Sequence, residues 1–178
     1  SDRDPNNPNN LILIYRQTSV SGVWDSGNTW NREHIWPQSL LGVSSNNGEV
    51  NIASDLHNLA PSNPSENSSR GNKYFFTSTN SDAYYPQEEA ARGYVARALF
   101  YMMTMYDHLE LVNSNPSTYE MGHLNTLLMW HFMVDVSDLE MQRNDVIFNN
   151  QGNRNPFIDY PHLIELIYWN HPDILTWE

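Results

Sequence analysis

The stretches that decide the fold are Asn31-Arg-Glu-His-Ile-Trp-Pro37 and Asp55-Leu-His-Asn-Leu-Ala-Pro61, followed directly by Ser62-Asn-Pro-Ser-Glu-Asn-Ser-Ser-Arg-Gly71. Turn residues at 25–28 give way to β-prone and aromatic residues, which predicts a strand that ends near Pro37. Residues 52–59 favour a second short strand, and residues 61–71 favour a short helix that begins at a proline and stops at a glycine. The sequence therefore predicts strand, loop, strand and short helix over residues 28–72.

The segments on either side complete the predicted architecture. Residues 1–10 are polar and rich in Pro and Asn, which predicts a disordered lead-in, and the β-rich run Leu11–Val20 predicts a strand. Apolar residues at helical spacing predict helices over 87–111, 119–134, 137–148 and 160–169, whereas the polar, broken stretch 151–161 favours neither helix nor strand. Ser137 and Glu140 predict a capping box. We therefore expect an α+β fold, with residues 11–178 as a single domain whose helical part covers 87–178.

Composition excludes several classes of site. The chain has 178 residues and no cysteine, which excludes disulfides, thiolate metal sites and a cysteine nucleophile. No uninterrupted apolar stretch reaches about 18 residues, so no membrane span is expected. A net charge of −12 argues against a polyanionic partner, but residues 1–80 carry five basic and seven acidic side chains, whereas residues 81–178 carry four and fourteen. The first half is therefore the part that can meet a polyanion.

Polar side chains in the predicted motif have chemistry that a hydrolytic site uses. Histidine titrates near neutrality, which suits His34 to the role of a general base. Asn67 offers an amide oxygen, which is a fair ligand for a hard cation, and without cysteine any metal must be held by histidine, carboxylate or amide oxygen. Taken singly, each has a plainer explanation: an exposed Glu–His pair beside a core tryptophan, and a soluble helix rich in Asn. Only their combination favours a site.

Five stretches of the chain, taken together, resemble the endonuclease I family, which are bacterial nucleases of the ββα-metal superfamily. The stretches are NREHIWPQS (31–39), DLHNLAPSNPSENSSRGN (55–72), RGYVARALFYM (92–102), RNDVI (143–147) and QGNRNPFIDYP (151–161). They follow one another in the family's order. The second and fifth are the specific signals, whereas Arg-Glu-His alone would be weak. The resemblance implies a ββα-metal core with a small antiparallel sheet, flanked by several α-helices.

The resemblance also implies roles for particular residues. Glu33 and Asn67 match the metal ligands, His34 matches the general base, and Asn58 matches the residue that braces the loop carrying the base. The candidates for phosphate contact or scaffold are Arg32, Arg70, Asn72, Arg154 and Asn155. The ring of His57 is expected to be structural. One departure from the pattern is that residues 35–69 contain no Lys or Arg, where some relatives place a phosphate-binding arginine.

The function implied is that of a sugar-nonspecific endonuclease that hydrolyses DNA or RNA and leaves 5′ phosphates. The expected cofactor is a divalent cation, Mg²⁺ before Mn²⁺ or Ca²⁺, and the expected enzyme is a secreted or periplasmic monomer that needs no membrane. Two alternatives stay open. The chain could be a catalytically silent, nuclease-like binding module, which its acidic charge favours, or a toxin nuclease held by an inhibitor protein.

Overall fold

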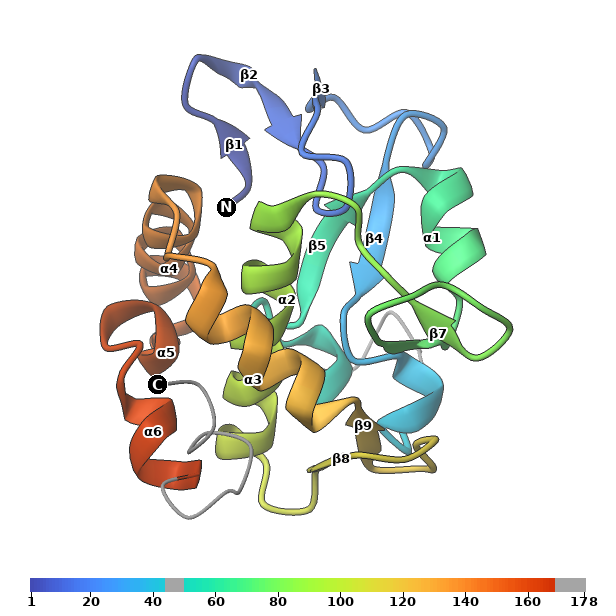
Figure 1. Ribbon diagram of the computed structural model, residues 1–178. Coiled ribbons are helices and arrows are strands. Elements are labelled where there is room, and N and C mark those ends of the chain that lie inside the picture. The colour runs from blue at the N-terminus through green and yellow to red at the C-terminus, as the bar shows by residue number, and fades with distance from the viewer. Residues whose placement is uncertain (44–49, 169–178) are drawn as a thin grey trace.

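The segments that carry the predicted motif form an antiparallel strand pair followed by a helix (Figure 1). This computed structural model describes residues 1–43 and 50–168, and its motif consists of β4 (Asn31–His34), β5 (Leu59–Ser62) and α1 (Pro64–Arg70). Asn63 begins the helix, because its side-chain oxygen accepts hydrogen bonds from the backbone N–H groups of Ser65 and Glu66. Gly71 ends the helix at φ 53°, a conformation that favours glycine. The predicted order of strand, loop, strand and short helix is confirmed.

The second strand lies later in the chain than expected. Residues Ile52–Ser54 form a 3-10 turn, η2, rather than the start of a strand. The Asn51 side chain accepts a hydrogen bond from the backbone N–H of Ala53 and so closes this turn locally. The prediction of a strand over residues 52–59 is therefore wrong, and pairing with β4 begins only at Leu59.

The first residues form a three-stranded antiparallel sheet, so the predicted disordered lead-in over residues 1–10 is wrong. The strands are β1 (Arg3–Asp4), β2 (Asn7–Ile12) and β3 (Ser19–Ser21), and β2 lies in the middle. Asp2 is buried, and its Oδ1 accepts hydrogen bonds from Arg143 Nε at 3.0 Å and the Tyr94 hydroxyl at 3.1 Å. This segment is held by an ion pair to a helix far along the chain, which its polar composition does not reveal.

The β-rich run Leu11–Val20 contains a turn. Gln17 has φ 50°, and its backbone N–H donates to the carbonyl of Leu13 at 2.8 Å. Leu13 and Tyr15 enter the core at this turn instead of continuing a strand. The prediction of one continuous strand is therefore wrong in its middle, because the apolar residues there belong to a buried turn.

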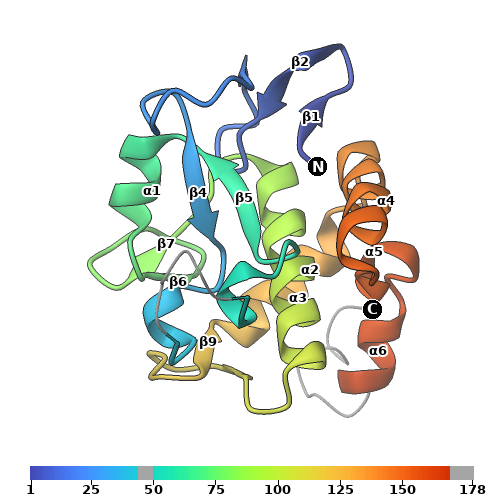
Figure 2. The ribbon, with the colours of Figure 1, turned by 180° about the vertical axis from the view of Figure 1, so that it is seen from behind.

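The second half is helical, as predicted, and one helix lies at its centre. The helices are α2 (Glu89–Met105), α3 (Leu124–Met133), α4 (Asp138–Gln151), α5 (Pro156–Asp159) and α6 (Leu163–Tyr168). Figures 1 and 2 show α2 with β4, β5 and α1 on one side and α4, α5 and α6 on the other. Ser137 and Glu140 form the predicted capping box. The short helix α5, which was not predicted, begins at Asn155, whose side chain accepts from the backbone N–H of Phe157.

Two short parallel strand pairs complete the architecture. They are β6 (Tyr74–Phe75) with β7 (Ala83–Tyr84), and β8 (Glu110–Val112) with β9 (Glu120–Gly122). The start of the helix predicted over 119–134 is thus strand β9, and residue 169 of the last predicted helix lies outside the described residues. The α+β class is confirmed, with antiparallel sheets in the motif and the N-terminal segment.

One hydrophobic core joins the strand pair to the helices. Ile35 and Trp36, directly after β4, are fully buried in the same cluster as Leu99 of α2 and Leu127 of α3. This packing anchors the end of β4 at which His34 lies. Within the described residues, no helix is both long and apolar enough to cross a lipid bilayer.

His131, on α3, is a buried histidine whose surroundings favour the neutral ring. Its Nε2 lies 2.9 Å from the carbonyl oxygen of Pro161, and its buried Nδ1 has no hydrogen-bond partner in the described part of the chain. Protonation would add a second ring N–H, which would be buried without a hydrogen-bond acceptor. Burial lowers the pKa of His131 to about 4, and Arg97 contributes in the same direction.

We predict that His131 makes the fold less stable as the pH falls from 6.5 to 4. The folded-state pKa of His131 lies below the unfolded value of 6.5, so the unfolded chain binds more protons than the folded one in this interval. The contribution of His131 to the free energy of unfolding is therefore lost as the pH falls. The loss is at most about 3 kcal/mol for a shift of this size. Urea unfolding at several pH values measures it. His131→Gln should flatten the dependence, and His162→Gln, at an exposed histidine, should not; equal slopes in all three proteins would contradict the prediction.

Candidate active site

An open pocket of about 460 Å³ lies between the end of β4 and the C-terminal half of α1. Residues from 31–39 and from 67–72 line it, and they include His34, Glu33 and Asn67. Neighbouring residues on a strand normally face opposite sides, but β4 ends at His34, where the chain turns toward Pro37. The structure therefore brings the predicted base and both predicted metal ligands to one pocket.

Glu33 is a buried carboxylate held by two side chains. Its Oε1 accepts hydrogen bonds from the Tyr15 hydroxyl at 2.5 Å and from Arg70 Nη1 at 2.8 Å. Burial raises the pKa of Glu33 above its usual value, although Arg70 and Tyr15 both act in the opposite direction. Both side-chain bonds use the same oxygen, so Oε2 is the oxygen that faces no side-chain donor among the described residues.

Arg70 belongs to the scaffold. Its side chain is 1% exposed, and its two terminal nitrogens donate to Glu33 and to the backbone carbonyls of His34 and Ile35. The guanidinium also lies over the ring of Phe75, with Cζ 4.7 Å from the ring centroid. The guanidinium is therefore engaged with the end of β4, although Arg70 also lines the pocket. Of the two roles expected for Arg70, support of the strand end is the one that these contacts provide, and contact with phosphate stays a prediction.

His34 is half-buried at the pocket wall. Burial lowers the pKa of His34 below 6.5, and the charges of Arg32 and Arg70 lower it further, whereas the backbone of Ala53 raises it. The ring is therefore neutral at pH 7 and has a nitrogen lone pair that can accept a proton. A neutral histidine at the opening of a polar pocket has the chemistry of a general base.

Asn58 holds the chain that follows His34. Its Oδ1 accepts from the Trp36 N–H at 2.7 Å, and its Nδ2 donates to the Trp36 carbonyl at 3.1 Å. The Asn58 carbonyl accepts from the Ile35 N–H at 3.0 Å. Because Asn58 is fully buried, these three bonds fix the loop after His34 relative to the start of β5.

The turn that carries Asn58 is itself fixed by the helices. Asp55 accepts hydrogen bonds from the hydroxyls of Tyr101 at 2.9 Å and Tyr106 at 2.8 Å. The Arg143 guanidinium donates to the backbone carbonyls of Leu56 and Leu59. The helical part thus sets the position of the loop that follows His34.

Asn67 points its carboxamide at β4. Its Nδ2 donates to Asn31 Oδ1 at 2.8 Å and to the Arg32 carbonyl at 3.2 Å. These bonds fix the nitrogen end of the amide, and no donor in the described residues hydrogen-bonds its oxygen. The Asn67 oxygen is therefore available to a ligand.

The remaining candidates lie partly in the pocket and partly elsewhere. Arg32, which is exposed, and Asn72 line the pocket. Arg154 does not: its guanidinium is paired with Asp145 and Asp159, at 2.8 and 2.7 Å. The structure therefore does not place Arg154 where a phosphate in this pocket could meet it.

Two support candidates are buried beneath the helices. Asn155 caps α5, and its Nδ2 donates to the Arg97 carbonyl at 2.9 Å. The ring of His57 packs against Tyr101 at 4.1 Å between centroids, and burial lowers the pKa of His57 to about 4. Both residues hold the scaffold and do not face the pocket.

Sequence reasoning missed Tyr15 and Asn31. Tyr15 reads as one aromatic residue within an apolar run, and Asn31 as one of many asparagines. Their contacts with Glu33 and Asn67 join segments 18 and 36 residues apart. No local pattern in the sequence carries such information.

The donor set fits one weakly coordinated divalent cation. Glu33 supplies a carboxylate, Asn67 supplies an amide oxygen, and both line the same pocket. No group of three or more His, Cys, Asp or Glu side chains that could hold a metal occurs in the described residues. A cation held by two protein oxygens would keep most of its water ligands, as Mg²⁺ prefers.

Comparisons with known proteins find a family model and several relatives that match this chain. The endonuclease I family model matches residues 2–162. The chain is 36% identical to an extracellular ribonuclease of Bacillus amyloliquefaciens over 94% of the chain and 64% of the relative, and 36% identical to one of Bacillus subtilis over 94% and 65%. It is 31% identical to endonuclease-1 of Buchnera aphidicola over 62% of the chain and 46% of that protein.

The chain thus spans a little less than two thirds of the length of the two ribonucleases, with nearly all of its own residues matched. The family match runs from the first sheet to the end of α5 and includes the whole pocket. This chain belongs to the endonuclease I family.

Proposed function

We propose that this chain is a metal-dependent, sugar-nonspecific endonuclease in which His34 is the general base and Glu33 and Asn67 hold the cation. The observation that carries the proposal is the meeting of a neutral, half-buried histidine with a carboxylate and an available amide oxygen in one pocket. Hydrolysis of a phosphodiester needs both a base for water and a positive charge for the phosphate.

In this proposal, His34 accepts a proton from a water molecule while the water oxygen attacks phosphorus. The bond from phosphorus to the 3′ oxygen breaks, the 5′ phosphate leaves on one product, and the 3′ oxygen takes a proton from solvent. A bound divalent cation would neutralise charge on the phosphate and on the leaving oxygen. Arg70 keeps Glu33 and the His34 carbonyl in place, so the base and the cation site share one rigid frame.

The proposed substrates are RNA and DNA. Two relatives are named ribonucleases and another an endonuclease, and chemistry directed at the phosphate does not require a particular sugar or base. The names of the Bacillus relatives also support secretion as the proposed location. A silent binding module remains the second candidate, because a net charge of −12 disfavours a catalytic nucleic-acid protein.

We predict that His34→Ala lowers kcat/KM by about 10²–10⁴-fold, the usual effect of losing a general base. In the wild type, kcat/KM should fall at acid pH with an apparent pKa below 6.5, because the base must be neutral and burial lowers the pKa of His34. Plasmid and RNA cleavage assays across pH 4–8 measure both effects. Activity of His34→Ala within threefold of wild type would mean that His34 is not the general base, and a wild type that cleaves neither substrate would favour the silent module.

Removal of either proposed ligand should weaken the cation site. Asn67→Ala should reduce Mg²⁺ affinity in calorimetry and should be partly rescued by more Mg²⁺. Glu33→Gln should do the same and also destabilise the fold by roughly 3–5 kcal/mol, because it leaves the Arg70 charge buried without its partner. Ser65→Ala, on the exposed side of the same helix, is the control. Unchanged Mg²⁺ affinity in both ligand variants would place the cation elsewhere.

We also predict a shallow salt dependence of substrate binding. In the described residues, Arg32 and Lys73 are the two cationic side chains with neither an ion pair nor a hydrogen bond, so few phosphates are neutralised by protein. A log–log slope of magnitude about 2 is expected from two such contacts. Binding of the His34→Ala variant to oligonucleotides with Ca²⁺, over a salt series, measures it. A slope of magnitude about 6 or more would mean that a basic surface contributes.

A further inference from the structure

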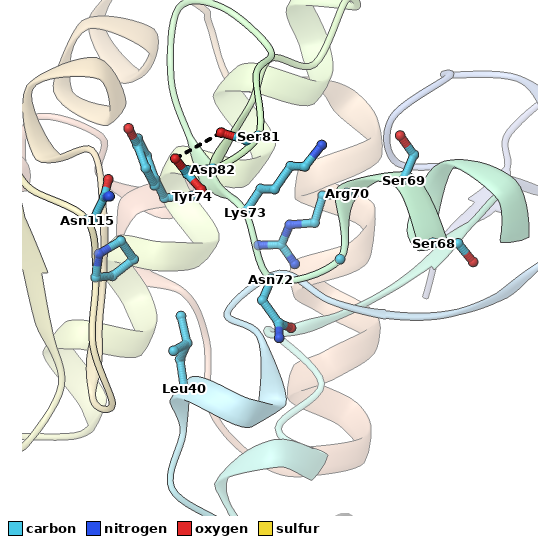
Figure 3. A pocket seen from close by; sticks show the side chains of 12 residues that line it. Leu40, Ser68, Ser69, Arg70, Asn72, Lys73, Tyr74, Ser81, Asp82 and Asn115 are labelled. Atoms are coloured by element: carbon cyan, nitrogen blue, oxygen red, sulfur yellow. Dashed lines mark hydrogen bonds between the residues drawn. The ribbon is translucent and has the colours of Figure 1, made fainter.

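A second pocket of about 500 Å³ adjoins the candidate active site (Figure 3). It shares Ser68, Arg70, Gly71 and Asn72 with the first pocket, so the two hollows meet at the end of α1. The second pocket is therefore next to the place where a phosphate would lie beside His34.

The second pocket holds the chain's only lysine. Of the nine basic side chains, five are paired with carboxylates: Arg16, Arg70, Arg97, Arg143 and Arg154. Arg3 and Arg92 donate to backbone carbonyls. Arg32 and Lys73 have no such partner among the described residues, and each lines one of the two pockets. Two of the four basic side chains without an ion pair in the described residues therefore line the two adjoining pockets.

The walls of the second pocket suit a nucleobase. Tyr74, Leu40 and Pro116 offer apolar and aromatic surface, while Asn72 and Asn115 offer amide donors and acceptors. Figure 3 shows Leu40, Asn72, Tyr74 and Asn115 around the open space. A base needs apolar faces and polar partners at its edge, and this pocket provides both.

Asp82 also lines the pocket and limits what can enter. Its Oδ2 accepts from the Ser81 hydroxyl at 3.0 Å, and it forms no ion pair with Lys73. A carboxylate beside one lysine disfavours a free phosphate or the two backbones of a duplex. It is compatible with a single nucleotide whose base edge, rather than its phosphate, faces Asp82.

We propose that this second pocket binds the unpaired nucleotide next to the scissile phosphodiester, with Lys73 on the backbone phosphate and Tyr74 beside the base. The inference rests on the proposed function, since it names a subsite of the same reaction. A base inside a duplex has both faces covered by its neighbours and cannot enter a side pocket. The subsite therefore favours single strands and loops over regular duplex.

Binding measurements test the subsite without cleavage. Fluorescence anisotropy with Ca²⁺ compares a single-stranded hexanucleotide with the duplex of the same sequence, using the His34→Ala variant as parent. Adding Lys73→Gln or Tyr74→Leu should weaken binding of the single strand by roughly five- to fiftyfold, the usual range for one stacked, charge-contacted nucleotide. Arg3→Gln removes the same charge from β1, outside both pockets, and should have little effect.

A kinetic measurement uses the protein with His34 intact. With Mg²⁺, KM should fall when a dinucleotide is lengthened toward the second pocket, and Lys73→Gln should abolish this gain, whereas Arg3→Gln, outside both pockets, should retain it. Single-strand binding by Lys73→Gln and Tyr74→Leu no weaker than by Arg3→Gln would overturn the proposal, as would an equal loss for duplex. If the wild-type protein cleaves no nucleic acid, weaker single-strand binding by Lys73→Gln and Tyr74→Leu would support the second pocket as a nucleotide site and would overturn the proposed function instead.

Discussion

The buried ion pair between Arg70 and Glu33 is the interaction on which the rest of the site depends. Arg70 is the last residue of α1, and its guanidinium reaches Glu33 and the backbone carbonyls of His34 and Ile35. The pair therefore fixes α1 against the end of β4, and Asn67, one turn earlier on α1, meets that strand at Asn31. The proposed base and the proposed cation ligands come from two elements, and one buried arginine sets the relative position of these elements.

The same pair makes the site sensitive to charge. Glu33 is buried enough that its pKa is raised, even with Arg70 and Tyr15 bonded to one oxygen. A single arginine offsets only part of the cost of burying the negative charge of a carboxylate. A divalent cation in the adjoining pocket would offset the rest. Metal binding would then stabilise the active-site frame as well as serve the reaction. In this view Arg70 would act on the reaction through position and charge.

The sequence predicted much of the site because its signals are local. Asn63, Pro64 and Gly71 mark the ends of α1, and Ser137 with Glu140 marks the start of α4. The motif that includes Glu33 and His34 follows from residue type and order. What could not be predicted depends on contacts between distant segments. Polar composition made residues 1–10 look disordered, although Asp2 is held by Arg143, 141 residues away. Arg70 was expected to contact phosphate or to support the scaffold, and only the fold shows that its side chain is buried.

The acidic charge of the chain is consistent with a nuclease once the partner of each basic side chain is identified. Five of the nine are spent on internal ion pairs that hold elements together, such as Arg97 with Glu140 between α2 and α4. Net charge therefore says little about the site, because what a substrate meets is the unpaired remainder. Of the four basic side chains without an ion pair in the described part of the chain, Arg3 and Arg92 donate to backbone carbonyls, whereas Arg32 and Lys73 lie on the two adjoining pockets. A strand would then be held by local contacts and a cation and not by long-range attraction. Such a protein would bind a nucleic acid only where the sugar-phosphate backbone of the nucleic acid fits the two pockets.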